Sequence, residues 1–311
     1  MDALSGLLDG PRARNAFLLR IVMDPPWSIE VRDESPLTVL AVVRGEAHLI
    51  GGPDPIRVAA GDVALVRGPD HYTMADSPST APQVVVHPGQ RCTTLGGTDL
   101  ALEMRLGVRT WGNDSDGATV MLVGAYEQQG AVGQRVLTSM PSMLVVPANE
   151  LDSPLVQLLA DEIVKDDHGQ ASVLDRLLDL LLVATLRTWF SRAGAAPAWW
   201  SAAADPIVGP ALRMLQDDPA HPWSIAELAS SVGVSRAGLA RRFTDLVGEP
   251  PIAFLTGLRL ALAADLLLDA DASLGSVAQR VGYGSPFALS VAFKRAYGVS
   301  PQAHRRAMAN A

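Results

Sequence analysis

The last third of this 311-residue chain repeats one short pattern after about 50 residues. Each copy carries a small residue, a glycine four residues later, an apolar anchor six or seven residues further on, and then phenylalanine, glycine and proline. The positions are Ala229, Gly233, Leu239, Phe243, Gly248 and Pro250, and then Ala278, Gly282, Leu289, Phe293, Gly298 and Pro301. Alanine lets two helices cross closely, and glycine adopts the left-handed backbone that ends the first of them. The pattern therefore predicts two helix-turn-helix units.

Residues that begin helices mark the same units independently. Ser224 and Glu227 have the spacing of a capping box, Ser235 is placed to cap the next helix, and Ser285 does the same in the second unit. The segment 252–270 between the units has about 19 helical residues, or roughly 28 Å of helix. Two recognition helices held about that far apart can enter successive major grooves of B-DNA, whose turn is about 34 Å. The spacing therefore favours double-stranded DNA as a partner.

The net charge of the whole chain does not favour DNA binding, but the charges of its two parts differ. The net charge is -8, with 15 Lys and Arg against 24 Asp and Glu in residues 1–204 and 10 against 9 in residues 205–311. A DNA-binding protein needs a basic surface locally rather than a basic chain. The C-terminal third therefore remains a candidate for nucleic-acid binding.

The second copy of the repeat also carries a family signature. Its sequence VGYGSPFALSVAFKRAYGVSPQAHRR matches the pattern G-[FY]-x-[SD]-x-x-x-[FL]-x-x-x-F-[KR]-x-x-x-G-x-[ST]-P. The stretch from Trp223 to Arg306 thereby resembles the DNA-binding domain of the AraC/XylS family. Upstream, WSI near Trp27, VLAVVRGEAHL and VAAGDVALVRGPDHY resemble the cupin-like regulatory domain that precedes this module in many members. The resemblance implies a sequence-specific transcription regulator controlled by a small molecule, with RNA polymerase as a further candidate partner.

The region from Trp27 to about Val146 has the pattern of short strands. β-branched runs alternate with turn residues such as Gly51-Gly52-Pro53, and this spacing is typical of a sandwich or a small barrel. The runs are residues 28–32, 38–43, 47–50, 63–66, 84–87 and 119–123. We therefore expect an α+β fold. Its parts are a cupin-like β domain (1–150), a helical pair (151–192), a linker (193–204) and an AraC-type DNA-binding domain with two helix-turn-helix motifs (205–311).

The second helix of the pair has a wide leucine face, from Leu174 to Leu186, that must be buried. Its partner is either the β domain or a second copy of the same helix, so homodimerisation is a hypothesis. Light scattering on a variant with Leu178 and Leu182 changed to Asp would test it. The small, uncharged residues of segment 193–204 are typical of a linker, on which we expect two tryptophans, at positions 199 and 200, to dock against a domain.

The first recognition helix is expected to read bases. Leu239 and Phe243 lie on one face and must point into the domain, which leaves the opposite face near the helix N-terminus for DNA. The predicted contacts are Ser235, Arg236, Ala237, Ala240 and Arg241. The family resemblance also implies base readers at positions 237, 240 and 241. Arginine can bond guanine through two hydrogen bonds, so Arg241 is the strongest single candidate.

The second recognition helix departs from the family pattern. Members often carry arginine before the residue equivalent to Ala292, and this chain has Val291 there. The predicted contacts of this helix are Ser285, Phe287, Ser290, Val291, Lys294 and Arg295. We expect the first helix to specify the sequence and the second mainly to anchor on phosphates, with Phe287 and Val291 touching a sugar edge or a neighbouring protein.

The β domain is expected to sense a small molecule. Trp27, His71 and Tyr72 are candidate effector-lining residues, with ordinary core packing as the alternative. A catalytic cupin needs several histidines and a carboxylate around one metal ion, usually beginning with an H-x-H pair that this sequence lacks. Glu46, His48, His71 and His87 are scattered, so we predict no metal, no cofactor and no catalytic residue. The alternatives are a constitutive dimeric regulator whose β domain binds no ligand and a metal-dependent cupin enzyme.

The remaining features concern the cellular compartment. Cys92 is the only cysteine, which excludes a disulfide scaffold and fits a reducing environment. Residues 1–19 lack the continuous apolar run of a secretory signal or membrane span. We therefore expect a cytoplasmic protein with no membrane partner.

Overall fold

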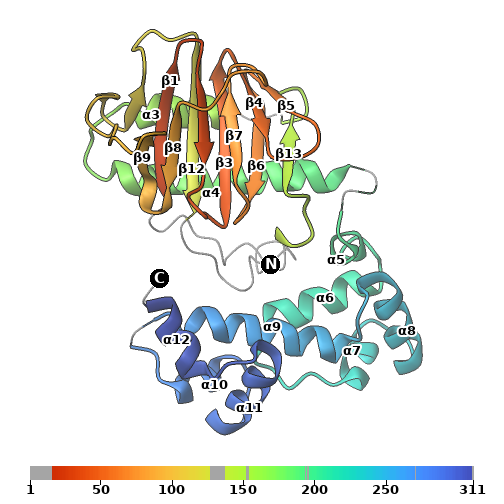
Figure 1. The fold of residues 1–311 in the computed structure, drawn as a ribbon. Coiled ribbons are helices and arrows are strands. Elements are labelled where there is room, and N and C mark those ends of the chain that lie inside the picture. Colours follow the sequence, from red (N-terminus) through yellow and green to blue (C-terminus); the bar gives the residue numbers. More distant parts are fainter. Residues whose placement is uncertain are drawn as a thin grey trace. The chain divides into compact units, whose positions relative to one another are not determined.

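The computed structural model describes residues 16–126, 137–151, 154–192, 194, 196–269 and 271–309. The described residues divide into two compact units: one contains residues before 130 and from 140 to 195, and the other contains residues 137–139 and those from 196 onward. The first unit contains the strands and two helices, and the second contains the remaining helices (Figure 1). The α+β class predicted from the sequence is confirmed.

The β unit consists of two sheets with a shared core. The strands are β1 (Phe17–Met23), β2 (Ser28–Val31), β3 (Leu37–Arg44), β4 (Glu46–Ile50), β5 (Ile56–Ala59), β6 (Val63–Arg67), β7 (Tyr72–Ala75), β8 (Val84–His87), β9 (Arg91–Thr94), β10 (Arg105–Gly107), β11 (Thr110–Gly112), β12 (Thr119–Tyr126) and β13 (Met143–Val146). One sheet has the order β10-β11-β1-β12-β3-β6-β13, and the other has the order β5-β4-β7-β2-β8-β9. Each of the strand runs expected from the sequence overlaps an observed strand.

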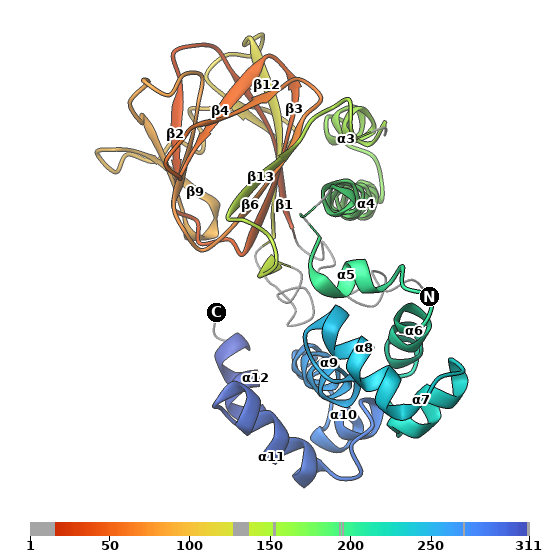
Figure 2. The same cartoon turned by 90° about the vertical axis from the view of Figure 1, so that its right-hand side faces the viewer.

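Helices α3 (Leu155–Ile163) and α4 (Gln170–Ser191) cover the outer face of the first sheet (Figure 2). Strands β3 and β12 are therefore buried on both faces, and their sequences are almost continuously apolar. Met121 points into the core between the sheets, while Gly124 lies under Leu178 of α4. A Cβ added at Gly124 would lie 2.7 Å from both methyl carbons of Leu178, so glycine permits the close approach of helix and sheet.

The C-terminal unit is entirely helical, and it contains both predicted helix-turn-helix units. Its helices are α5 (Ala198–Ala202), α6 (Val208–Asp217), α7 (Ile225–Ser231), α8 (Arg236–Val247), α9 (Pro251–Leu266), α10 (Leu274–Arg280), α11 (Pro286–Tyr297) and α12 (Pro301–Ala309). The first helix-turn-helix unit consists of α7, a turn and α8, and the second helix-turn-helix unit consists of α10, a turn and α11. Gly233 and Gly282 have positive φ values of 71° and 77° at the two turns, as the repeat predicts.

Helix α9 connects the units and belongs to the cores of both. Phe254, Leu255 and Leu258 pack in the first core, and Leu260 and Ala264 pack in the second. The helix has 16 residues rather than the expected 19 or so. Just after its end, the Leu267 carbonyl accepts a hydrogen bond of 2.9 Å from Arg305 Nε of α12.

The segment 193–204, expected as a linker, contains helix α5. Ala202 is fully buried in the first core, and α5 contacts α8. The small residues that resemble a linker in the sequence thus allow close packing here. Trp200 is half-buried, and the side chain of Trp199 lies outside the described residues.

No single helix in the described part of the chain is long and apolar enough to cross a membrane. Helices α8 and α9 meet the length and composition criteria only as a pair, which is bent by 55°.

Candidate nucleic-acid interface

The two recognition helices, α8 and α11, begin in the same way. Ser235 Oγ accepts a hydrogen bond of 3.1 Å from the Gly238 N–H, and Ser285 Oγ accepts one of 3.1 Å from the Ala288 N–H. These caps satisfy a backbone donor at each helix N-terminus, so both helices start at the residue that the repeat predicts. The serines are therefore positioned as caps, at the end of each helix from which DNA contacts were expected.

The anchors of both helices point into the protein. Leu239 and Phe243 of α8 are fully buried, as are Leu289 and Phe293 of α11. Because these anchors fix the rotation of each helix, the opposite face is presented to solvent. Figure 1 shows α8 and α11 near opposite ends of α9.

The outward face of α8 carries the predicted base readers. Arg236, Ala237 and Arg241 are exposed, and Ala240 is half-buried. Arg236 and Arg241 make no hydrogen bond or ion pair with another described residue. Their guanidinium groups therefore remain available for an external acceptor.

Arg242 differs from its neighbour in the sequence because it is already paired. Its guanidinium donates to both carboxylate oxygens of Asp205, with the shortest distance 2.6 Å. The hydrogen bond from Arg242 is the main reason that the pKa of Asp205 falls to about 2. Arg242 thus ties α8 to the start of α6.

The outward face of α11 is apolar at its start and basic at its end. Phe287 is 79% exposed and Val291 is 55% exposed, whereas Ser290 is half-buried. Lys294 and Arg295 are exposed in the following turns. The structure therefore presents at the surface the apolar and basic side chains selected from the sequence, with no polar side chain at position 287 or 291.

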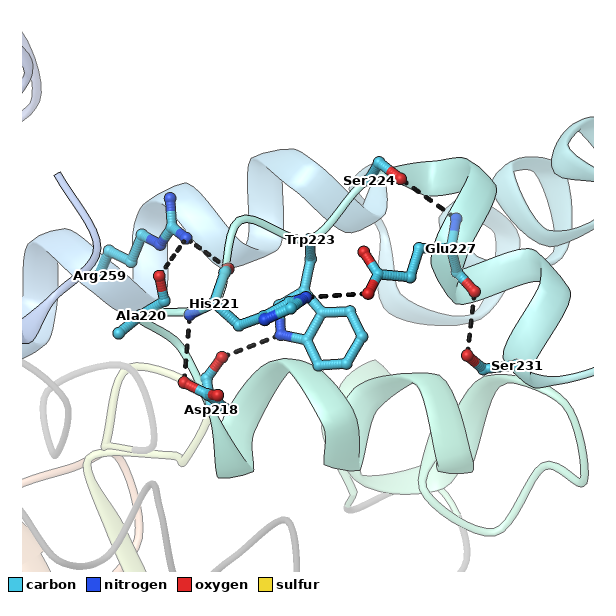
Figure 3. A network of polar contacts seen from close by, with 8 residues as sticks. All are labelled: Asp218, Ala220, His221, Trp223, Ser224, Glu227, Ser231 and Arg259. Carbon is cyan, nitrogen blue, oxygen red and sulfur yellow. Dashed lines mark hydrogen bonds and ion pairs between the residues drawn. The ribbon is translucent and has the colours of Figure 1, made fainter. Parts of the chain in front are cut away.

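A hydrogen-bond network connects the loop between α6 and α7, which precedes the first helix-turn-helix unit, to α9 (Figure 3). Arg259 of α9 donates from Nε to the Pro219 carbonyl at 2.6 Å and from Nη2 to the His221 carbonyl at 2.8 Å. The Nη2 atom also contacts the Ala220 carbonyl at 3.4 Å. The same loop supports the second unit, because a Cβ on Gly282 would lie 2.4 Å from the Ala220 oxygen. The loop between α6 and α7 is therefore packed against both α9 and the turn of the second unit.

The capping box predicted at Ser224 and Glu227 is only half formed. Ser224 Oγ accepts from the Glu227 N–H at 3.1 Å, as expected. The Glu227 carboxylate instead pairs with His221 Nε2 at 2.9 Å, and the Trp223 indole donates to the Asp218 carbonyl at 2.9 Å (Figure 3). These contacts stabilise the loop that Arg259 holds.

Three further arginines near the two helix-turn-helix units were not identified from the sequence. Arg259 and Arg305 bind loop carbonyls, and Arg280, in the last turn of α10, is an additional exposed cation. Burial lowers the pKa of Arg259 from its ordinary value. The sequence signal for half-buried Arg259 is a single arginine in a largely apolar helix, which does not identify its partners.

The effector candidates of the β unit are placed differently from one another. Tyr72 is buried and lines a cavity of about 40 Å³ between the sheets. Trp27 is fully buried in the same core without lining the cavity, and His71 is exposed. Burial raises the pKa of Tyr72, so its hydroxyl stays neutral.

The lining of this cavity is mainly apolar. The lining residues are Phe17, Leu19, Ile21, Ile29, Val31, Asp33, Thr38, Tyr72, Met74, Val86, Gln90, Cys92, Trp111 and Val123. Asp33 already accepts hydrogen bonds from Ser35 and Gln90. The buried Trp111 indole N–H finds no acceptor among the described residues.

The histidines considered as metal ligands are separated. His48 Nδ1 lies 3.1 Å from the Asp76 carbonyl oxygen, and His87 Nε2 lies 2.9 Å from Thr93 Oγ1. Within the described part of the chain, no group of three or more His, Cys, Asp or Glu side chains is arranged to hold a metal ion. Burial raises the pKa of Cys92 to about 11, which keeps this thiol protonated near neutral pH.

Comparison with known proteins covers both units. Residues 2–191 match the family described as Cupin, and residues 228–307 match the helix-turn-helix domain family. Putative AraC-like transcription regulators from Streptomyces lividans and Streptomyces antibioticus are 34% and 32% identical, each over 98% of this chain and over 98% and 99% of their own lengths. A crystal structure of the AdpA DNA-binding domain with target DNA is 35% identical, covers 33% of this chain and 93% of that chain, and has a TM-score of 0.31.

Proposed function

The chain belongs to the AraC-like transcription regulators, and from this premise we propose that α8 specifies the DNA sequence while α11 mainly anchors the protein. The observation that carries the proposal is the difference between the exposed faces of the two helices. Arg241 has no partner among the described residues and can bond guanine through two hydrogen bonds. Lys294 and Arg295 are suited to phosphates, which position a protein without reading its sequence.

Binding assays on two variants test this division. Footprinting of the gene's own upstream region supplies the operator, and fluorescence anisotropy compares it with unrelated duplex DNA. Arg241→Ala should weaken operator binding by about 5- to 150-fold and affect unrelated DNA much less. Arg241→Lys is the matched control, because it keeps the charge and loses the paired hydrogen bonds. Lys294→Ala should weaken both DNAs alike and reduce the salt dependence by about one counterion. A loss of specificity confined to the Lys294 variant would contradict the proposal.

We further propose that the β unit binds a small, predominantly apolar effector in the cavity that Tyr72 lines. The apolar lining and the unpartnered Trp111 N–H support a ligand with one hydrogen-bond acceptor. An apolar cavity of about 150 Å³ accommodates benzene. At about 40 Å³ the present cavity takes only a few atoms, so a larger effector must displace lining side chains. Such displacement would favour one conformation of the regulator over another.

Thermal unfolding with substituted benzenes and short-chain alcohols tests for this site. A ligand that binds only the folded state should raise the unfolding midpoint. A cavity-filling Val86→Phe variant should lose the shift, while a change at exposed His71 should keep it. If no compound shifts the wild type, the alternative of a β unit that binds no ligand is favoured.

Helix α4 is proposed as a dimerisation element, but through a different face from the one expected. Leu178 and Leu182 are buried within one copy, so changing them to Asp would disrupt the fold rather than test a dimer. A second apolar stripe lies at residues 173, 177, 180 and 184, spaced by four, three and four as in a coiled-coil seam. Val173 and Leu180 in this stripe are 45% and 53% exposed.

Light scattering on Leu180→Asp tests the dimer. The variant should halve the mass of a wild-type dimer while the thermal midpoint of the β unit changes little. Leu158→Asp at an exposed position of α3 is the control, since it alters surface charge outside the stripe. An unaltered dimer mass would reject pairing through this stripe.

We also propose that the protein is a cytoplasmic regulator and not an enzyme. The full-length relatives are regulators, and the protonated Cys92 thiol is a poor nucleophile. Metal analysis of the purified protein tests the remaining alternative. A stoichiometric transition metal lost on changing His48 or His87 would favour a cupin enzyme.

A further inference from the structure

The two recognition helices can be aligned residue by residue through the repeat. An offset of 50 pairs the capping Ser235 with Ser285, the buried Leu239 with Leu289, and the buried Phe243 with Phe293. Paired residues thus have the same role in the structure. The same offset pairs Arg241 with Val291 and Ala237 with Phe287.

The equivalence extends to the surface around each helix. A shallow groove beside α8 is lined by Gly238 and Arg241, and a groove beside α11 is lined by their counterparts Ala288 and Val291. Phe287 lines the second groove as well. Where the first helix presents a guanidinium, the second therefore presents an aliphatic side chain with an aromatic ring one turn before it.

Packing does not explain these apolar side chains. The core contact of α11 is made by Leu289 and Phe293, both fully buried, whereas Phe287 and Val291 are 79% and 55% exposed. Residues four apart on a helix lie on one face, so the two exposed side chains form a single patch. The patch lies in the first two turns of α11, and these turns are the part of a recognition helix that reaches base edges.

The surroundings of the patch favour DNA over an apolar protein surface. Helix α11 contains no Asp or Glu, and Lys294 and Arg295, three and four residues after Val291, are exposed. Arg280 adds an exposed cation at the end of α10. An apolar patch bordered by cations that have no partner among the described residues matches a groove bordered by phosphates.

The thymine methyl is the one apolar group in the major groove that such a patch can contact. Base edges there present hydrogen-bond donors and acceptors, and thymine alone adds a C5 methyl group. Valine and phenylalanine can neither donate nor accept. We infer that α11 reads thymine methyl groups through Phe287 and Val291, so that the operator carries guanine opposite Arg241 and thymine opposite α11. This inference rests on the proposed placement of α8 and α11 on DNA.

Replacing thymine by deoxyuridine tests the inference, because it removes the methyl group and leaves base pairing intact. The operator found by footprinting is synthesised with deoxyuridine in the α11 half-site, the α8 half-site, or neither. The full-length protein should bind about fourfold more weakly for each contacted methyl lost in the α11 half-site. Substitution in the α8 half-site should weaken binding less for each methyl lost, because Ala237 and Ala240 each present only one methyl group there.

Protein variants assign the methyl effect to the patch. Val291→Ala and Phe287→Ala should each lower the ratio of thymine to deoxyuridine affinity, and the double variant should bring this ratio close to one. Lys294→Ala is the matched control, because it should weaken binding to both duplexes while keeping their ratio. Both patch residues are exposed, so circular dichroism and the thermal midpoint should stay unchanged in their variants.

The outcomes separate this inference from the proposed function. Equal affinity of the wild type for all duplexes, with operator specificity retained, would overturn methyl readout. The same holds if Phe287→Ala keeps its DNA affinity and methyl ratio but loses binding to RNA polymerase, which would assign the patch to a protein partner. No specific binding to any duplex would instead contradict the DNA-binding proposal itself.

Discussion

Replacing Arg259 by methionine should uncouple the loop between α6 and α7 from helix α9. The methionine keeps an apolar stem of similar length, so the packing beside α9 is largely preserved. The substitution removes two N–H donors: Arg259 Nε, which lies 2.6 Å from the Pro219 oxygen, and Arg259 Nη2, which lies 2.8 Å from the His221 oxygen. Hydrogen bonds from a charged group contribute about 1.5–3 kcal/mol each, and the half-buried position favours the lower value. The loop should therefore lose about 3 kcal/mol of local stability.

Hydrogen exchange of the full-length protein measures this loss directly. A change of about 3 kcal/mol corresponds to roughly 100-fold faster exchange of the loop amides. The amides of His221 and Trp223 report on it, because both are hydrogen-bonded within the loop. Arg213→Met is the control, since Arg213 is an exposed arginine on α6.

The same substitution should weaken DNA binding selectively. The loop also supports Gly282 in the turn of the second unit, so its loosening relaxes the spacing of α8 and α11. Affinity for the full operator should fall, whereas affinity for a duplex carrying one half-site should change little. If loop exchange and full-operator affinity both match the Arg213 control, the Arg259 network does not hold the two units in register.

Three further substitutions have expected effects on stability. Gly124→Ala should lower the thermal midpoint by an amount equivalent to about 1–3 kcal/mol, because its Cβ would meet Leu178 at 2.7 Å; Gly52→Ala, with no atom within 4 Å, is the control. Asp205 has a folded pKa of about 2, below its unfolded value of about 3.9, so its stabilisation is fully present above about pH 4 and is lost as pH falls toward 2. Asp205→Asn should therefore unfold at a lower temperature than the wild type at pH 7, and the difference should shrink between pH 4 and pH 2. Ser285→Ala should cost about 1 kcal/mol through the lost cap of α11, measured by thermal unfolding, and a Ser285→Thr variant should retain most of it.

The helix-turn-helix region was predictable because its signals are local. The serine caps act within three residues, and the positive φ of Gly233 and Gly282 is confined to single turns. The sheet depends on pairing between distant segments, which the sequence does not reveal. His71 precedes a strand whose next residue, Tyr72, is buried, and only the register distinguishes an exposed position from one that lines the cavity. For the same reason, the sequence identified Tyr72 and His71 together although the structure separates them.

Side-chain partners far apart in the sequence limited what could be predicted of the interface. Arg241 and Arg242 are adjacent in the sequence, and Asp205, 37 residues before Arg242, determines which of them is paired. The exposed face of α11, by contrast, followed from helix periodicity alone, because Leu289 and Phe293 fix its rotation. Periodicity thus gives the direction of a side chain, and the tertiary structure decides whether that side chain is free.

Strand β12 links the two features on which the proposed regulation depends. Val123 lines the cavity, and the next residue, Gly124, lies under Leu178 of α4. Successive strand residues point to opposite faces, so under the proposed regulation a ligand that displaces Val123 would also shift the surface on which α4 packs. The exposed stripe around Leu180 lies on that same helix. Ligand binding and dimerisation would then be coupled, and any factor by which a ligand changes the dimer affinity must equal the factor by which dimerisation changes the ligand affinity. Ligand titrations of the wild type and Leu180→Asp should therefore differ by the same factor as dimer dissociation with and without ligand, and equal ligand affinities would show that β12 does not couple the two sites.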